Sequence, residues 1–178
     1  CGLAEPHLPF RPATLEELAA GHDRRYLETL RELSGPAAGP GIGLHGLGPG
    51  DNPGFPGLFE FVSLLAGGSL EAARQVRDHG RSAAFNPAGG MHHALPGRAT
   101  GFCYVNDPVL AIRELLKTAE RVVYLDIDAH HGDGVQWAFY ESPRVLTISL
   151  HQHPATLFPG TGFIEEMGRG AGRGYAVN

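Results

Sequence analysis

The sequence is poor in cysteine and almost without lysine. Its two cysteines, Cys1 and Cys103, are too few for a disulfide framework and are typical of a reducing compartment, so we expect a cytoplasmic protein. Lys117 is the single lysine among 14 basic residues. Together with the abundant Gly, Ala and Pro, this bias favours a GC-rich, bacterial genome.

An excess of basic charge and long apolar runs are missing too. The chain carries 14 basic and 19 acidic residues, a net charge of −5, and no basic stripe, so we expect no direct nucleic-acid contact. No apolar run reaches membrane-spanning length and no signal peptide is visible, so we expect no membrane association. With 42% hydrophobic content, 178 residues are enough for one α/β domain with a substantial core.

The two ends of the chain predict an incomplete domain. The sequence starts at Cys1 instead of Met, and residues 175–178, Y-A-V-N, are typical of an incoming strand. We therefore expect residues 1–178 to form only part of a larger domain.

The first half of the chain is predicted to be mainly helical. Residues 14–17, T-L-E-E, have the capping-box spacing and are followed by apolar residues at helical intervals, which predicts one or two amphipathic helices. Residues 35–57 are rich in Gly and Pro and predict a long loop. Residues 58–66 and 70–79 predict two helices, separated by a Gly-Gly pair and with Ser69 as the cap of the second.

The second half alternates between strand and helix patterns. We expect strands at residues 82–86, 122–125 and 144–150, and helices at residues 107–118 and 135–140. The run V-V-Y-L has the composition of a strand that is buried on both faces. This alternation predicts a parallel sheet with right-handed crossovers, in which ligands bind beyond the carboxyl ends of the strands.

A dense polar cluster follows one of these strands. In the segment D-I-D-A-H-H-G-D, Asp126, Asp128 and His130 project to the same side, because side chains of an extended chain alternate. Two carboxylates left unpaired there would be costly, so a cation is expected between them. An oxygen and a nitrogen donor suit Zn²⁺ or Fe²⁺ better than Mg²⁺ or Ca²⁺, and a third ligand must come from elsewhere.

Adjacent histidines follow a Gly-Gly turn at a second strand end. The two histidines, His92 and His93, could each pair with one of two carboxylates, those of Asp126 and Asp133. A carboxylate that accepts from one imidazole nitrogen raises the basicity of the other, so two such pairs beside a metal predict metal-assisted hydrolysis. The alternative for a lone histidine is a hydrogen-bonded structural residue, and for Asp51 it is an Asx-turn in a Pro/Gly loop.

Six motifs together resemble one known family. They are G-D-N-P-G-F-P-G-L-F-E-F, G-G-M-H-H-A, G-F-C-Y-V-N-D, D-I-D-A-H-H-G-D-G-V, F-P-G-T-G and Y-A-V-N. From about Thr14 to Asn178 the chain is similar to the histone deacetylases and acetoin-utilisation proteins, which are metal-dependent deacetylases. The resemblance implies an arginase-like, three-layer α/β fold with a parallel β-sheet flanked by helices, of which this chain is an N-terminal part.

The resemblance also implies roles for the polar cluster. Asp128 and His130 would be zinc ligands, while the third ligand, an aspartate, and a catalytic tyrosine would lie in a C-terminal half. The 178 residues alone are therefore expected to bind zinc poorly and to be inactive. The general base would be His93, paired with Asp133. Its electrostatic partner would be His92, paired with Asp126.

Substrate contacts and further ions follow from the same resemblance. Phe102 and Phe158 would be the aromatic walls of an acyl-lysine channel, the Gly101 carbonyl would accept the amide N–H, and Asp51 would hold the substrate backbone at the rim. One potassium ion is implied at Asp126, Asp128, His130, Ser149 and Leu150. A second is implied at carbonyls of Phe139, Ser142, Val145 and Tyr175.

Several alternative functions stay open at this point. The substrate could be acetyl-lysine on a protein or an acetylated polyamine or other small N-acyl amine. A dimanganese ureohydrolase of the same fold is disfavoured, because Gly132 and Met91 replace carboxylates of its motifs. A catalytically dead homologue that binds acylated peptides is disfavoured by the intact histidines and aspartates.

Overall fold

A computed structural model of the chain describes residues 8–35 and 43–178. In chain order its elements are α1 (Leu15–Leu18), α2 (Arg24–Glu32), the 3₁₀ helix η1 (Leu44–Gly46), α3 (Leu58–His79), α4 (Asp107–Leu115), β1 (Val122–Asp126), α5 (Asp133–Phe139), β2 (Val145–Ser149), the 3₁₀ helix η2 (Gly170–Gly172) and β3 (Ala176–Val177). Cys1 and part of the long loop expected at residues 35–57 lie outside the described residues.

The three strands form one parallel sheet. Their order is β1-β2-β3, and the register places Val122 opposite Val145 and Thr147 opposite Ala176. Because the strands are parallel, the polar residues that follow β1 and β2 emerge at the same edge of the sheet. The expected parallel sheet is confirmed, and the turns that follow β1 and β2 lie at the same edge of it.

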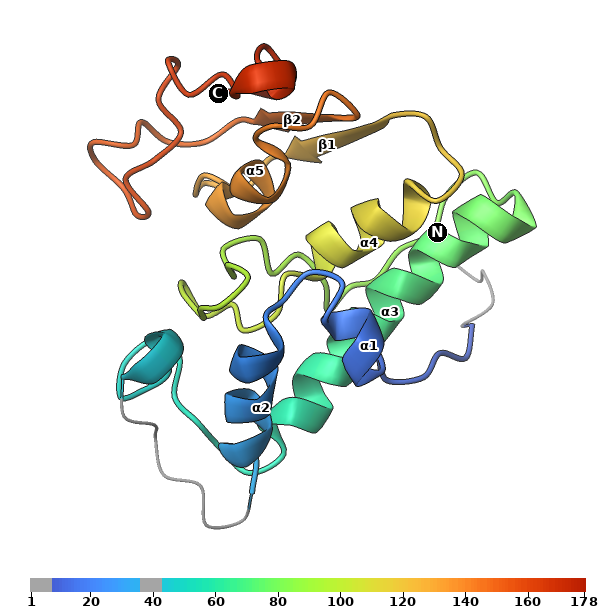
Figure 1. The fold of residues 1–178 in the computed structure, drawn as a ribbon, viewed down its shortest axis with the longest axis vertical. Coiled ribbons are helices and arrows are strands. Elements are labelled where there is room, and N and C mark those ends of the chain that lie inside the picture. The colour runs from blue at the N-terminus through green and yellow to red at the C-terminus, as the bar shows by residue number, and fades with distance from the viewer. Residues whose placement is uncertain (1–7, 36–42) are drawn as a thin grey trace, which may run out of the picture.

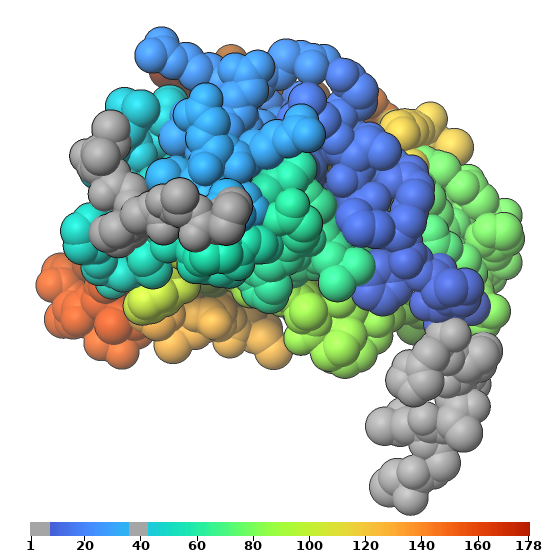
Figure 2. Space-filling model, turned by 90° about the horizontal axis from the view of Figure 1, so that it is seen from below, coloured from blue at the N-terminus to red at the C-terminus, as the bar shows by residue number. Residues whose placement is uncertain are grey.

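Two hydrophobic clusters support this arrangement. In Figure 1, α4 and α5 lie on one side of the sheet, and α1, α2 and α3 lie beyond α4. The cluster between the sheet and its helices consists of Val109, Ile112, Val135, Phe139 and Val145. The larger cluster joins α1, α2, α3 and the start of α4 and includes Leu18, Tyr26, Leu27, Leu58, Val62 and Leu110. Figure 2 shows the helical face opposite the sheet, where α2 and α3 form much of the surface.

The opposite face of the sheet is apolar and open. Val123, Leu125 and Ile127 are 62%, 59% and 77% exposed, and the register puts Leu146 and Ile148 beside the first two. The expectation that β1 is buried on both faces is therefore wrong for this structure, because α4 and α5 cover only one side. This face of the sheet is therefore an exposed apolar patch in the described part of the chain.

Helix α3 runs without a break through the Gly-Gly pair that was expected to divide it. It spans 22 residues, and Gly67 is buried against the N-terminal segment, where a Cβ atom would lie 2.0 Å from the Arg11 carbonyl oxygen. Ser69 is not a helix cap; its hydroxyl donates to Asp107 at 2.5 Å. The glycines thus permit close packing across the helix, which the sequence pattern could not distinguish from a helix end.

Two further expectations have different outcomes. The capping box is confirmed, since the Thr14 hydroxyl accepts from the Glu17 amide at 3.2 Å and the Glu17 carboxylate accepts from the Thr14 amide at 2.7 Å. The strand expected at residues 82–86 is wrong, because this segment is irregular and Phe85 is 87% exposed. In the described part of the chain no neighbouring strand lies beside it, so no ladder of backbone hydrogen bonds can form.

Within residues 8–35 and 43–178, no helix is both long enough and apolar enough to cross a membrane.

Candidate active site

The first His–Asp pair joins the histidine turn to the end of β1. His92 Nδ1 donates to Asp126 Oδ2 at 2.7 Å, and both side chains are buried. The Tyr124 hydroxyl donates to the same carboxylate oxygen at 2.6 Å. Burial disfavours the ionised carboxyl, but the hydrogen bonds from His92 and Tyr124 outweigh burial and lower the pKa of Asp126 below its usual range. The expected pairing of His92 with Asp126 is present in the geometry.

The same carboxylate acts on the imidazole. Burial alone would lower the pKa of His92, but the hydrogen bond and the negative charge of Asp126 outweigh it, and the pKa of His92 is raised. His92 is therefore an imidazole whose cationic form is stabilised by its partner.

The second pair lies directly beside the first. His93 Nδ1 donates to Asp133 Oδ1 at 2.7 Å, and Asp133 is the first residue of α5. The rings of His92 and His93 have centroids 4.0 Å apart. Because each Nδ1 is held by a carboxylate, each Nε2 is the nitrogen left for chemistry. The structure thus brings together the four residues expected to be catalytic.

The two expected metal ligands form a third, more exposed pair. His130 Nδ1 lies 2.9 Å from Asp128 Oδ1, and the side chains are 41% and 52% exposed. The ring of His130 is 5.9 Å from that of His93, centroid to centroid. A carboxylate oxygen and an imidazole nitrogen this close can hold one cation, and this donor set fits zinc. No group of three His, Cys, Asp or Glu residues that could complete such a site is present among residues 8–35 and 43–178.

Sequence reasoning missed two residues that hold the histidine turn. Asn106, the N-cap of α4, accepts from the Val109 amide at 3.1 Å, while its amide group donates to the carbonyls of His92 and Ala94, both at 3.0 Å. The N-D-P start was interpreted only as a helix signal. The hydrogen bonds from Asn106 to the histidine turn join residues that are distant in sequence, so no local pattern could have indicated them.

The neighbouring aspartate holds the other side of the turn. Asp107 is 2% exposed and accepts from the amides of Gly90 at 3.1 Å and Met91 at 2.9 Å. Burial raises the pKa of its carboxyl although these bonds oppose the shift. Asn106 and Asp107 therefore clamp the backbone around His92 and His93 against the N-terminus of α4.

A buried histidine extends this clamp and predicts a pH-dependent stability. His22 Nε2 accepts a hydrogen bond from the backbone N–H of Asn106 at 2.9 Å. Nδ1 of His22 is therefore protonated and donates to the Leu95 carbonyl at 3.1 Å. Burial lowers the pKa of His22 from 6.5 to about 4. Below pH 6.5 His22 becomes protonated in the unfolded chain but stays neutral in the folded chain. The free energy of unfolding therefore falls as the pH is lowered from 6.5 to about 4. The loss attributable to this group is at most about 3 kcal/mol.

Urea unfolding at pH 7.5, 5.5 and 4 measures this contribution. His22→Gln is expected to lower stability at pH 7.5 and to show a smaller loss on acidification than the unsubstituted protein. Replacement of the exposed His153 by Gln serves as the control and should keep the full loss. Equal pH slopes for His22→Gln and the unsubstituted protein would contradict the assignment.

Two of the expected channel residues, Gly101 and Phe158, lie against His93. The ring of Phe158 is 4.9 Å from that of His93, and a Cβ atom on Gly101 would lie 2.6 Å from His93 and 2.8 Å from Phe158. Only glycine fits at this position, where φ is +54°. Phe102 follows with φ 66° and is 70% exposed, an unusual backbone for a bulky residue that is found mainly at functional sites.

Asp51 lies on a loop that is hydrogen-bonded to the segment after Phe102. Its neighbour Asn52 is buried and donates to the Cys103 carbonyl at 3.4 Å, and the Tyr104 hydroxyl donates to the Pro53 carbonyl at 2.8 Å. Asp51 itself is exposed. Because Cys103 directly follows Phe102, the loop of Asp51 borders the segment of the expected channel.

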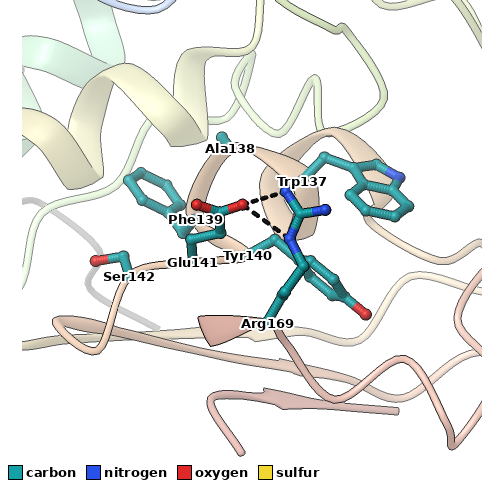
Figure 3. A pocket seen from close by; sticks show the side chains of 7 residues that line it. All are labelled: Trp137, Ala138, Phe139, Tyr140, Glu141, Ser142 and Arg169. Carbon is teal, nitrogen blue, oxygen red and sulfur yellow. Dashed lines mark hydrogen bonds and ion pairs between the residues drawn. The ribbon is translucent and has the colours of Figure 1, made fainter. Parts of the chain in front are cut away.

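The residues expected to bind potassium fall into two groups. Asp126 and Ser149 are opposite each other in the β1–β2 register, and the Leu150 amide donates to the Asp126 carbonyl at 2.9 Å, so the first group is contiguous. Phe139 and Ser142 line an open pocket of about 620 Å³, shown in Figure 3, in which Arg169 pairs with Glu141. Val145, the first residue of β2, and Tyr175, which directly precedes β3, complete the second group. Both potassium sites stay predictions.

The fold and these side chains define an α/β protein with two buried His–Asp pairs and an Asp/His donor pair at the carboxyl end of a parallel sheet. The chain belongs to the histone deacetylase family: residues 2–178 match the histone deacetylase domain. It is 44% identical, over 169 residues, to histone deacetylase B of Dictyostelium discoideum, a match that covers 94% of this chain and 40% of that protein.

Solved structures agree with this membership. A crystal structure of an HDAC homologue from Aquifex aeolicus has 43% identity and a TM-score of 0.89, and the match covers 96% of this chain and 46% of that one. An HDAC homologue complexed with SAHA has 43% identity and a TM-score of 0.88, with the same coverage. The expected fold class is confirmed. The chain spans less than half the length of these relatives.

Proposed function

We propose that the complete protein is a zinc-dependent deacetylase that hydrolyses the amide of N-acetyl-lysine or of a related N-acetyl amine. The observation that carries this proposal is the geometry of two buried His–Asp pairs beside the Asp128–His130 pair. Membership of the histone deacetylase family supports it. This chain spans less than half the length of its relatives, and the proposal assigns the third zinc ligand to residues outside it.

Asp128 and His130, with a third ligand from outside the chain, would hold the zinc ion. When bound there, zinc would polarise the acyl oxygen and lower the pKa of a water molecule. His93 Nε2 takes the proton from the attacking water, because Asp133 holds Nδ1 of the same ring. The water oxygen bonds to the acyl carbon, the C–N bond breaks so that acetate is released, and His93 returns the proton to the nitrogen of the leaving amine.

The other groups act by position and charge. His92, whose cationic form is favoured by Asp126, supplies positive charge beside His93 as negative charge develops on the acyl oxygen. Phe158 and Phe102 would line the path of the acyl chain, and the Gly101 carbonyl would accept the amide N–H. Potassium at the Asp126–Ser149 group would neutralise the carboxylates next to the zinc site.

Substrate identity divides the proposal into two forms. One HDAC homologue of known structure is complexed with SAHA, which supports binding of an acetyl-lysine-like ligand here. Acetylated lysine in protein is therefore the first candidate, and an acetylated polyamine or other small amine is the second. The two differ in what must be accommodated at the rim, where Asp51 is exposed.

The test uses the protein encoded by the complete reading frame that contains these residues. We expect it to release acetate from an acetyl-lysine peptide, to be inhibited by SAHA and to contain about one zinc ion per molecule. Acetylpolyamine is assayed in parallel to separate the two substrates. The 178-residue chain alone is expected to be inactive.

Two results would overturn the proposal. A content near two manganese ions per molecule would favour a ureohydrolase. Binding of acetyl-lysine peptide without any release of acetate would favour a peptide-binding module.

A further inference from the structure

One histidine of the D-A-H-H-G-D segment has no part in the proposed chemistry. His131 is 2% exposed and points away from the His–Asp pairs, toward the loop of residues 151–167 that follows β2. Its Nδ1 lies 2.8 Å from the Thr161 hydroxyl and its Nε2 lies 3.1 Å from Gln136 Oε1. Both ring nitrogens of His131 are therefore used in contacts with the protein.

The hydrogen-bond partners determine the tautomer of His131. The Gln136 amide nitrogen donates to Glu166 at 2.8 Å, so the Gln136 oxygen is the atom that faces His131. An amide oxygen can only accept, which makes His131 Nε2 the donor. Nδ1 is then unprotonated and accepts from the Thr161 hydroxyl.

His151, at the start of the same loop, is held in a similar way. Its Nε2 donates to the Gly162 carbonyl at 3.0 Å, because a carbonyl oxygen only accepts. Its Nδ1 accepts from the Ser149 hydroxyl at 2.8 Å. The rings of His131 and His151 have centroids 4.8 Å apart.

Gly162 lies against both imidazoles. Its φ is +92°, and a Cβ atom there would be 2.5 Å from His151 Nε2 and 2.6 Å from His131 Cγ. Its amide donates to Glu166 Oε1 at 3.0 Å, which ties the loop back onto itself. Any side chain at Gly162 would force one of the rings or the loop backbone to move.

The segment held in this way begins with Phe158. Its ring contacts His93 at a centroid distance of 4.9 Å and lies 6.3 Å from that of His130. His130 directly precedes His131 in the chain. The turn that carries a proposed metal ligand and the loop that carries a proposed channel wall are thus joined through one buried imidazole.

We propose that His131 and His151 are positioning residues that hold Thr161 and Gly162 and thereby fix Phe158 beside His93. Neither histidine binds metal or transfers a proton in this role. The consequence for the reaction rests on the proposed function: loosening the clamp displaces an acyl-channel wall and weakens substrate binding, while the metal stays bound.

Thr161→Val in the complete protein tests the clamp, because valine has nearly the shape of threonine but cannot donate to His131 Nδ1. A buried acceptor without its partner is costly, so KM for acetyl-lysine peptide and the Kd of SAHA should each rise about tenfold, with kcat changed by less than about twofold. Zinc content should stay at the level of the unsubstituted protein. Hydrogen exchange at the amides of Gly162 and Phe163 should become faster.

Two companion variants distinguish the clamp from a general effect of loop substitution. Thr161→Ser keeps the hydroxyl and should restore KM, SAHA binding and slow exchange. Thr156→Val removes a hydroxyl from the same loop. Among the described residues this hydroxyl bonds to Gln152 and His153 alone, and the variant should behave as the unsubstituted protein.

Each outcome decides the proposal. Unchanged exchange in Thr161→Val overturns it, as does unchanged KM and SAHA affinity in an active protein, or a loss of zinc together with activity. If the unsubstituted protein neither releases acetate nor binds SAHA, the proposed function fails. The exchange rates of Thr161→Val and Thr161→Ser then still decide whether the clamp exists.

Discussion

Replacement of His93 by alanine is expected to lower kcat for deacetylation about 10³-fold in the complete protein, with zinc content unchanged. His93 combines a buried carboxylate on Nδ1 with a ring contact to Phe158 at 4.9 Å between centroids, so it is the group best placed to take a proton from water near the acyl chain. Proton transfer by a positioned side chain contributes about 10²- to 10⁴-fold to rate. Single-turnover kinetics and metal analysis of the purified variant measure the two quantities.

The control for this variant is His153→Ala. His153 is exposed, and its ring meets that of Phe163 edge-on, with centroids 6.0 Å apart. It should leave kcat and zinc content as they are. Activity of His93→Ala within about tenfold of the unsubstituted protein would refute the general-base role, since this loss would be below the usual range for such groups.

Replacement of His130 by alanine is expected to remove the metal. Loss of groups that only orient a metal ligand costs about 10- to 100-fold in metal affinity, and loss of a ligand itself should cost more than the upper figure. His130 and Asp128 are the proposed ligands from this chain, and His130 Nδ1 lies 2.9 Å from Asp128 Oδ1. Metal content after dialysis, measured by elemental analysis, should fall from about one zinc ion per molecule to near zero, and activity should fall with it.

Asp133→Asn provides the contrast to this variant. Asp133 orients His93 and does not lie in the donor pair, so the substitution should reduce turnover while zinc remains. A His130→Ala protein that keeps its zinc through dialysis would show that the ion is held by other residues.

The parallel sheet and the polar cluster were predictable because both follow from short stretches of sequence. The apolar run at Val122 followed by Asp126 predicted a strand and a ligand-bearing end, and β1 spans Val122–Asp126. The Thr14 capping box predicted the start of α1 in the same way. In each case neighbouring residues determine the structure, through side-chain alternation or a local hydrogen bond.

The errors occur where a residue responds to a distant part of the chain. Gly67 was interpreted as a helix break, but its missing side chain makes room for the Arg11 backbone. Residues 82–86 have a strand pattern, yet a strand needs a partner and the described residues supply none beside this segment. The open apolar face at Leu125 has the same cause, since a buried face requires a layer that packs on it.

The sequence by itself therefore determined the consecutive elements β1, α5 and β2 and the family to which the chain belongs, and it predicted the chemistry of Asp128 and His130. The resemblance also predicted which histidine meets which aspartate. Only the tertiary structure decided how those side chains are held: Asn106 and Asp107 on one side of the histidine turn, and His131 against Thr161 on the other side of the site. The physical reason is that hydrogen bonds between buried groups depend on distances across the fold, and sequence separation does not specify them.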